Sequence, residues 1–93
     1  MTETEHLLVC LAEECAEIQQ AVTKALRFGL QDNYKDSTPA QDIARELCDL
    51  IAVVELLEEA GVIKKTGTID AIERKKARVW HYMEYARARG TLE

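Results

Sequence analysis

Hydrophobic residues recur along most of the chain at steps of three and four positions, which is the period of an amphipathic α-helix. The first such segment carries the stripe Leu8, Leu11, Cys15, Ile18, Val22 and Ala25 or Leu26. The second carries Ile43, Leu47, Leu50, Ile51, Val54 and Leu57, widened by Val53 and Leu56. The third carries Ile69, Ile72, Val79, Trp80 and Met83. No segment of useful length alternates hydrophobic and polar residues, so the pattern predicts helices and no β-sheet.

Glycine and proline indicate where these helices begin and end. Glycine readily adopts the left-handed conformation that follows a helix, and it comes after each periodic segment, at Gly29, Gly61 and Gly90. Thr38 and Gln41 have the spacing of a capping box, with Pro39 at the first helical position, where proline is favoured. The sequence therefore predicts helices over about residues 4–28, 39–60 and 68–89.

Three helices of this length predict an all-α fold, a helical bundle in which residues 1–93 form a single domain. The second helix has adjacent apolar pairs, such as Leu50 with Ile51, so its stripe is wider than one neighbouring helix would cover. A domain of this size is also only marginally stable alone. We therefore expect the bundle to be completed by association of identical chains.

Charge is unevenly distributed along the 93 residues, whose net charge is −5. Residues 1–63 carry 13 acidic and 4 basic side chains, whereas residues 64–93 carry 4 acidic and 8 basic ones. The acidic total argues against a nucleic-acid-binding protein, and no apolar run is long enough to span a membrane. The segment MTETEHLL lacks the basic residues of a signal peptide. With three cysteines and no C-x-x-C pair, we expect a cytoplasmic protein whose thiols are reduced and mostly buried.

Two pairs of carboxylates border the apolar stripes. Glu14 and Glu17 lie one helical turn apart, and Glu46 and Asp49 repeat that spacing on the second helix. Antiparallel packing of the two helices would bring the pairs opposite one another, at a cost in repulsion and desolvation that a divalent cation would remove. Oxygen ligands alone suit Mg²⁺ or Mn²⁺. The alternative is an ordinary solvated acidic face, with Arg45 paired to Asp49.

A family resemblance strengthens the metal interpretation. The run EECAEIQQAVTKALRFG, followed after a loop by ARELCDLIAVVELL, resembles the MazG-like all-α nucleoside triphosphate pyrophosphohydrolases. The family pattern is E-x-x-E, a spacer and E-x-x-D, here Glu14, Glu17, Glu46 and Asp49 with a spacer of 28 residues, 18–45. The resemblance covers roughly residues 5–60 and implies a helical bundle that assembles as a homodimer or homotetramer.

The resemblance implies Mg²⁺-dependent cleavage of an NTP or dNTP between its α- and β-phosphates, giving a monophosphate and pyrophosphate. The four acidic residues would bind Mg²⁺, with Mn²⁺ as a substitute. Glu17, or else Glu14, would orient or deprotonate the attacking water. We expect substrate contacts from Lys24, Arg27, Phe28, Lys75, Arg78 and Tyr82.

Two alternatives stay open at this point. A small acidic bundle with a wide apolar stripe is also typical of a non-catalytic adaptor or regulatory oligomerisation module that docks a partner helix. A phosphoribosyl-ATP pyrophosphohydrolase would use the same bundle chemistry on a different nucleotide. In addition, Lys24, Arg27 and the basic tail have an ordinary reading as exposed surface charges.

Overall fold

The structure is a computed structural model that describes residues 1–65 and 67–93. Within these residues it contains three α-helices and no strand: α1 (Glu3–Phe28), α2 (Pro39–Glu59) and α3 (Ile69–Arg89). The all-α prediction is confirmed. The predicted helix limits agree with the observed ones to within a residue or so.

A threonine side chain caps the start of each helix, as the sequence indicates for α2. At α2 the Thr38 hydroxyl accepts from the backbone N–H of Gln41, and the Gln41 side chain accepts from the backbone N–H of Thr38. Thr2 and Glu5 form the same reciprocal pair at α1, a capping box not predicted above. Such caps satisfy N–H groups that have no partner inside the helix, which fixes the first turn.

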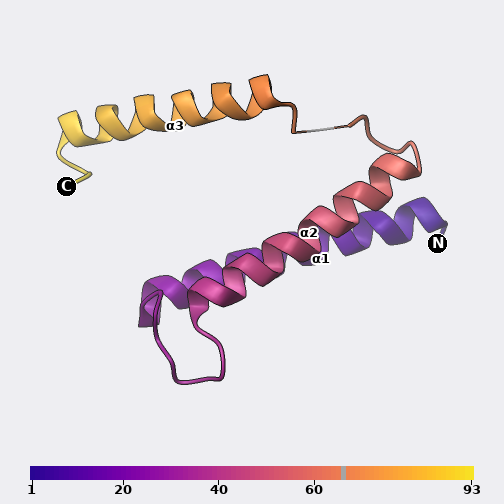
Figure 1. Ribbon diagram of the computed structural model, residues 1–93, viewed down its shortest axis with the longest axis horizontal. Coiled ribbons are helices and arrows are strands. Elements are labelled where there is room, and N and C mark those ends of the chain that lie inside the picture. Colours follow the sequence, from indigo (N-terminus) through magenta and orange to yellow (C-terminus); the bar gives the residue numbers. More distant parts are fainter. Residues whose placement is uncertain (66) are drawn as a thin grey trace.

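Helices α1 and α2 form an antiparallel hairpin whose contact seam follows a four-three repeat (Figure 1). The less exposed residues of α1 in this repeat are Leu7, Leu11, Glu14, Ile18, Ala21 and Ala25. Those of α2 are Pro39, Ile43, Glu46, Leu50, Val53 and Leu57. This spacing is that of a coiled-coil seam. Each helix therefore places one glutamate among its inward-facing positions.

The predicted stripe of α1 is wrong in phase at several positions. Leu8, Cys15, Val22 and Leu26 are exposed, whereas Ala21 and Ala25 are only 7% and 8% exposed. The two candidate stripes are one residue, or about 100°, apart on the helix. Small alanine side chains let the helices approach closely, and this decides which stripe faces α2.

Helix α3 does not pack against either helix of the hairpin in the part of the chain that is described. It runs back along the hairpin at a distance (Figure 1). Within one chain the expected three-helix bundle is therefore present only as a two-helix hairpin. The radius of gyration is 16.6 Å, against about 12 Å for a compact domain of this length. Among residues 1–65 and 67–93, neither α1 nor α2 packs on α3, which accounts for the large radius of gyration.

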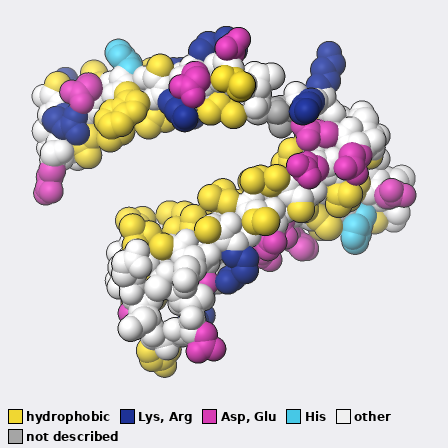
Figure 2. All heavy atoms as spheres, in the orientation of Figure 1, with side chains coloured by type: hydrophobic (Ala, Val, Ile, Leu, Met, Phe, Trp, Pro, Cys, Tyr) yellow, Lys and Arg dark blue, Asp and Glu magenta, His cyan; other side chains and the backbone are white. Residues whose placement is uncertain are grey.

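Hydrophobic side chains line the side of α3 that faces the hairpin and the side of the hairpin that faces α3 (Figure 2). The exposed hydrophobic residues of these two helices include Leu47, Ile51 and Leu56 of α2 and Ile72, Val79 and Trp80 of α3, all between 43% and 62% exposed. Cys15 and Cys48 are free and exposed, so the prediction of mostly buried thiols is wrong for the single chain.

None of the described helices combines the length and apolar character needed to cross a membrane.

Candidate functional site

The four carboxylates that the sequence pairs on two helices meet in the hairpin. Glu14 and Glu17 come from α1, and Glu46 and Asp49 come from α2. Each offers one carboxylate oxygen, and these four oxygens all lie within 4.8 Å of one another. Antiparallel packing, with one turn between the members of each pair, brings them together. We call this group the acidic cluster.

Two members of the acidic cluster occupy inward-facing positions of the seam. Glu14 Oε2 and Glu46 Oε2 are buried and receive no hydrogen bond. A buried acceptor without a donor costs about 1–3 kcal/mol. A positive charge lies near the other oxygen of Glu46: Arg45 Nη2 is 3.5 Å from Glu46 Oε1. These glutamates therefore differ from solvated surface acids, because each has an oxygen that water does not reach.

Crowding of negative charge perturbs Glu17. Its pKa is raised above the ordinary value of 4.5, first through a hydrogen bond that its protonated form shares with the Glu46 carboxyl group. The negative charges of Glu14, Glu46 and Asp49 raise the pKa further. In the ionised cluster no group donates this hydrogen bond, which is consistent with the unpartnered Glu46 oxygen.

The donor set of the acidic cluster consists of carboxylate oxygens only. Hard cations such as Mg²⁺ and Mn²⁺ take these ligands, usually through a few carboxylates with retained waters. A cation would satisfy both unpartnered oxygens and reduce the repulsion that raises the pKa of Glu17. The residues present therefore fit a divalent cation, although exposed acidic groups of this kind are common without one.

A cavity of about 240 Å³ adjoins the acidic cluster and is lined by Glu17 and Glu46 together with three cations. These are the predicted Lys24 and two residues that the sequence analysis did not assign to the site, Lys35 and Arg45. Cations beside a carboxylate cluster can contact phosphate oxygens while the carboxylates hold a metal. The cavity therefore places carboxylates and cations side by side along one wall.

Arg45 does not pair with Asp49, the alternative that the sequence left open. Its Nη1 instead lies 3.0 Å from Asp42 Oδ1, to which the Ser37 hydroxyl also donates a hydrogen bond of 2.6 Å. These two donors, Ser37 first, hold the pKa of Asp42 below its ordinary value of 3.8. Asp42 thus positions Arg45 at the cavity wall as an ionised partner.

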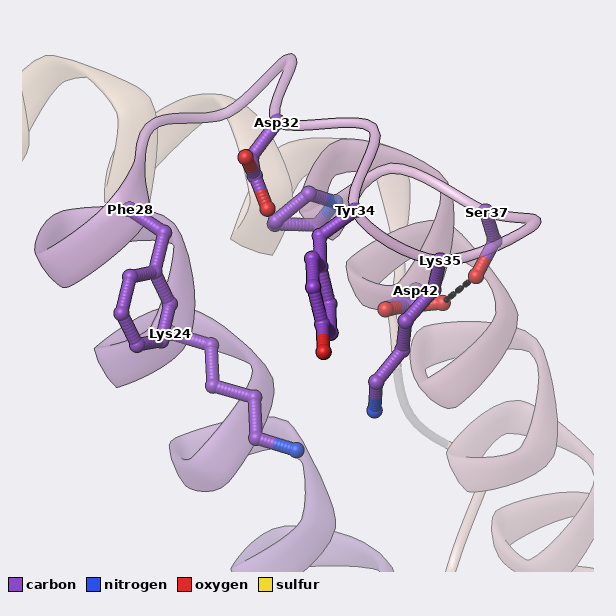
Figure 3. Close-up of a pocket in the computed structure, with 8 residues that line it drawn as sticks. Lys24, Phe28, Asp32, Tyr34, Lys35, Ser37 and Asp42 are labelled. Carbon is purple, nitrogen blue, oxygen red and sulfur yellow. Dashed lines mark hydrogen bonds between the residues drawn. The ribbon is translucent and has the colours of Figure 1, made fainter.

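The remaining predicted substrate contacts lie in different places. Phe28 lines a second cavity, of about 420 Å³, beside the first (Figure 3). Arg27 lines neither cavity, and its guanidinium lies 4.7 Å from the centre of the Phe28 ring. Lys75, Arg78 and Tyr82 share one side of α3, as predicted, and line a hollow of their own. Because α3 does not pack on the hairpin, one chain does not bring these three residues to the acidic cluster.

The sequence signal for the missed residues was weak. Lys35, Ser37 and Asp42 follow the first helix in the stretch YKDSTPAQD, which has the composition of an ordinary loop and helix start. Their placement depends on the path of the loop and not on a periodic pattern. Comparison of this chain with protein-family models, with curated proteins and with solved structures finds no match.

Proposed function

We propose that this protein is a Mg²⁺-dependent nucleoside triphosphate pyrophosphohydrolase, similar to the MazG-like enzymes. The observation that carries the proposal is the acidic cluster, in which two glutamates occupy seam positions that hydrophobic residues would otherwise fill. Two oxygens there lack donors. Such a costly arrangement is typical of a ligand site, where perturbed groups gather for a chemical role.

Mg²⁺ bound by Glu14, Glu17, Glu46 and Asp49 would neutralise the triphosphate and polarise the α-phosphoryl group. Glu17 is the exposed glutamate of the cluster, and it faces the cavity that the phosphates would occupy. Its carboxylate would take a proton from water as the water oxygen bonds to the α-phosphorus. The bond from that phosphorus to the bridging oxygen then breaks, and pyrophosphate leaves with the electron pair.

Cations at the cavity would stabilise the leaving pyrophosphate. Lys24, Lys35 and Arg45 line the same space as Glu17 and Glu46. Phosphoryl transfer depends mainly on positioning and charge stabilisation, so fixed cations next to the metal ligands support this chemistry.

The test is to incubate the protein with each NTP and dNTP and Mg²⁺ and to measure pyrophosphate and orthophosphate separately. We expect pyrophosphate and the nucleoside monophosphate in equal amounts. Glu17→Gln should lower kcat by about a hundredfold or more, the range typical for loss of a general base. Glu55→Gln changes an exposed glutamate of α2 outside the cluster and serves as the control. Pyrophosphate from no nucleotide would overturn the proposal, and orthophosphate would mean that another bond is cleaved.

We also propose that the working unit contains a second copy of the chain. The accessible surface of one chain is 7645 Å², about 2,200 Å² more than a compact protein of this mass exposes. A standard interface needs only about 800 Å² from each partner. The acidic residues 1–63 and basic residues 64–93 have opposite net charge. These features support packing of α3 of one copy on the hairpin of the other, which would bring Lys75, Arg78 and Tyr82 toward a substrate.

The exposed apolar faces also favour the second candidate, a non-catalytic adaptor that docks a partner helix. An adaptor would show no Mg²⁺ dependence and would tolerate Glu17→Gln and Asp49→Asn. The pyrophosphohydrolase requires both side chains for turnover, with helical content unchanged in circular dichroism. Absence of turnover in the wild-type protein, together with partner binding that both variants retain, would favour the adaptor.

A further inference from the structure

The cavity of about 420 Å³ lies where α1 ends, between the loop 29–38 and the start of α2 (Figure 3). Phe28, the last residue of α1, and Tyr34, from the loop, flank it from opposite sides. These rings are 56% and 89% exposed. Two large aromatic side chains that face the same open space provide surfaces on which a planar ring can stack.

Backbone hydrogen bonds hold the loop that forms this wall. Gly29 has a φ of +99°, which lets the chain turn away at the end of α1. Its carbonyl accepts from the N–H of Asp32 at 3.2 Å, and the Leu30 carbonyl accepts from the N–H of Ala40 at 3.0 Å. The second bond ties the loop to the first turn of α2. Tyr34 and Asp32 thus extend from a loop that is fixed at both ends.

This cavity and the one beside the acidic cluster share four lining residues: Lys24, Lys35, Ser37 and Asp42. The two cavities are therefore neighbours, joined at the two lysines. Figure 3 shows both lysine side chains reaching toward the same end of the aromatic cavity. From the acidic cluster outward, the order is metal ligands, cations and aromatic rings. A nucleotide has a corresponding order, with its metal-bound, negatively charged phosphates at one end and its base at the other.

Asp32 provides a means of distinguishing one base from another. Its side chain points into the aromatic cavity between Phe28 and Tyr34 (Figure 3). No hydrogen bond or ion pair within residues 1–65 and 67–93 engages its carboxylate, whereas the Asp42 carboxylate is held by Ser37 and Arg45. An ionised carboxylate accepts hydrogen bonds and donates none. It therefore matches a base edge that carries an amino group.

We infer that this cavity is the nucleobase subsite, with Phe28 and Tyr34 stacking on the base and Asp32 accepting a hydrogen bond from an exocyclic amino group. The inference rests on the proposed function. It assigns base recognition to the loop 29–38 and to Phe28, and not to α3. The subsite favours amino-bearing bases over those with a carbonyl at the same place, because a carbonyl oxygen facing Asp32 leaves two acceptors opposed.

CTP and UTP test this inference directly, because cytosine has an amino group at position 4 where uracil has a carbonyl. We expect kcat/KM of the wild-type protein to favour CTP about tenfold, within the range that one base-edge contact supplies. Asp32→Asn should reduce this ratio to about one, since an amide both donates and accepts. Tyr34→Ala should raise KM for both nucleotides about tenfold through loss of stacking, with little change in kcat. Asp36→Asn neutralises an exposed acid of the same loop outside the cavity and should leave the ratio unchanged.

A binding measurement separates this inference from the proposed function. NMR titration of the protein with CTP in EDTA should shift the ring resonances of Phe28 and Tyr34 without any turnover, and Tyr34→Ala should weaken that binding. Ring shifts without pyrophosphate release under Mg²⁺ would support the subsite and overturn the hydrolase. Pyrophosphate release with unchanged ring resonances, or an unaltered CTP to UTP ratio in Asp32→Asn, would overturn the subsite and leave the hydrolase standing.

Discussion

Replacing Glu46 by leucine should stabilise the metal-free protein while removing its response to Mg²⁺. Glu46 is an inward-facing residue of α2 whose side chain is only 15% exposed. Leucine at this position would complete the four-three apolar repeat of α2. If Glu46 served packing, its substitution by leucine would destabilise the protein. If it serves to bind a ligand, the substitution should stabilise the metal-free protein.

The expected gain follows from three contributions. Removal of the unpartnered Oε2 acceptor relieves about 1–3 kcal/mol. Burial of a leucine side chain adds up to about 1.5–3 kcal/mol relative to an exposed one, part of which the glutamate methylenes already supply. Loss of the 3.5 Å contact with the exposed Arg45 costs about 0–1 kcal/mol. We expect a net gain of about 2 kcal/mol, or about 8–16 °C in Tm for a domain of this size.

Differential scanning calorimetry in EDTA and in excess Mg²⁺ would measure both effects. Wild-type protein should gain about 2.7 kcal/mol when Mg²⁺ is at a hundred times its Kd, and Glu46→Leu should gain nothing comparable. Glu55→Leu makes the same change at an exposed position of α2 and should alter stability by no more than about 0.5 kcal/mol in either buffer. A lower Tm of Glu46→Leu in EDTA would refute the argument that this glutamate strains the seam. An undiminished Mg²⁺ response would show that the cation binds elsewhere.

Two further predictions concern pH and assembly. Because the pKa of Glu17 is raised in the folded protein, folding holds its proton more tightly, so this residue's contribution to stability falls as pH rises from 4.5 through the folded pKa. In EDTA the free energy of unfolding of wild-type protein relative to Glu17→Gln should therefore decrease across that window. Guanidinium titrations at several pH values would measure this difference, and an increase with pH would contradict the prediction. For assembly, sedimentation velocity should show at least a dimer that Ile51→Lys, at a 58% exposed position of α2, dissociates. A monomeric wild-type protein would contradict the proposed second copy.

Much of the fold was predictable because local signals decide it. The Thr38 cap, Pro39 and the terminal glycines fix helix limits through backbone chemistry within a few residues. The meeting of the pair Glu14 and Glu17 with the pair Glu46 and Asp49 was also predictable, since antiparallel helices joined by a short loop bring such positions together. What failed was the phase of α1, where two apolar stripes one residue apart compete. The choice between them depends on Ala21 and Ala25 fitting closely against α2, which periodicity alone does not reveal.

The position of α3 and the loop cavity lay beyond sequence reasoning for different reasons. A stripe containing Ile72 and Trp80 predicts that α3 will be covered, but not by which surface, and within one chain neither helix of the hairpin covers it. The cavity depends on the path of a loop without periodicity, held by bonds such as Leu30 to Ala40.

The two glutamates in the seam connect stability with function. An apolar repeat that is interrupted once on each helix, at positions that meet, should leave the hairpin less stable than the same hairpin with leucine there. The helix caps and the closely packed Ala21 and Ala25 lie outside the acidic cluster. The expected loss of stability is therefore local to the acidic cluster. A bound cation would restore the lost stability at that place, which couples folding to ligand binding by mass action. Glu14 and Glu46 would then be the anchoring ligands, because their inward positions limit their motion. The exposed Glu17 and Asp49 are the members free to adjust to water and phosphate, and substitutions of these two should affect turnover more than folding.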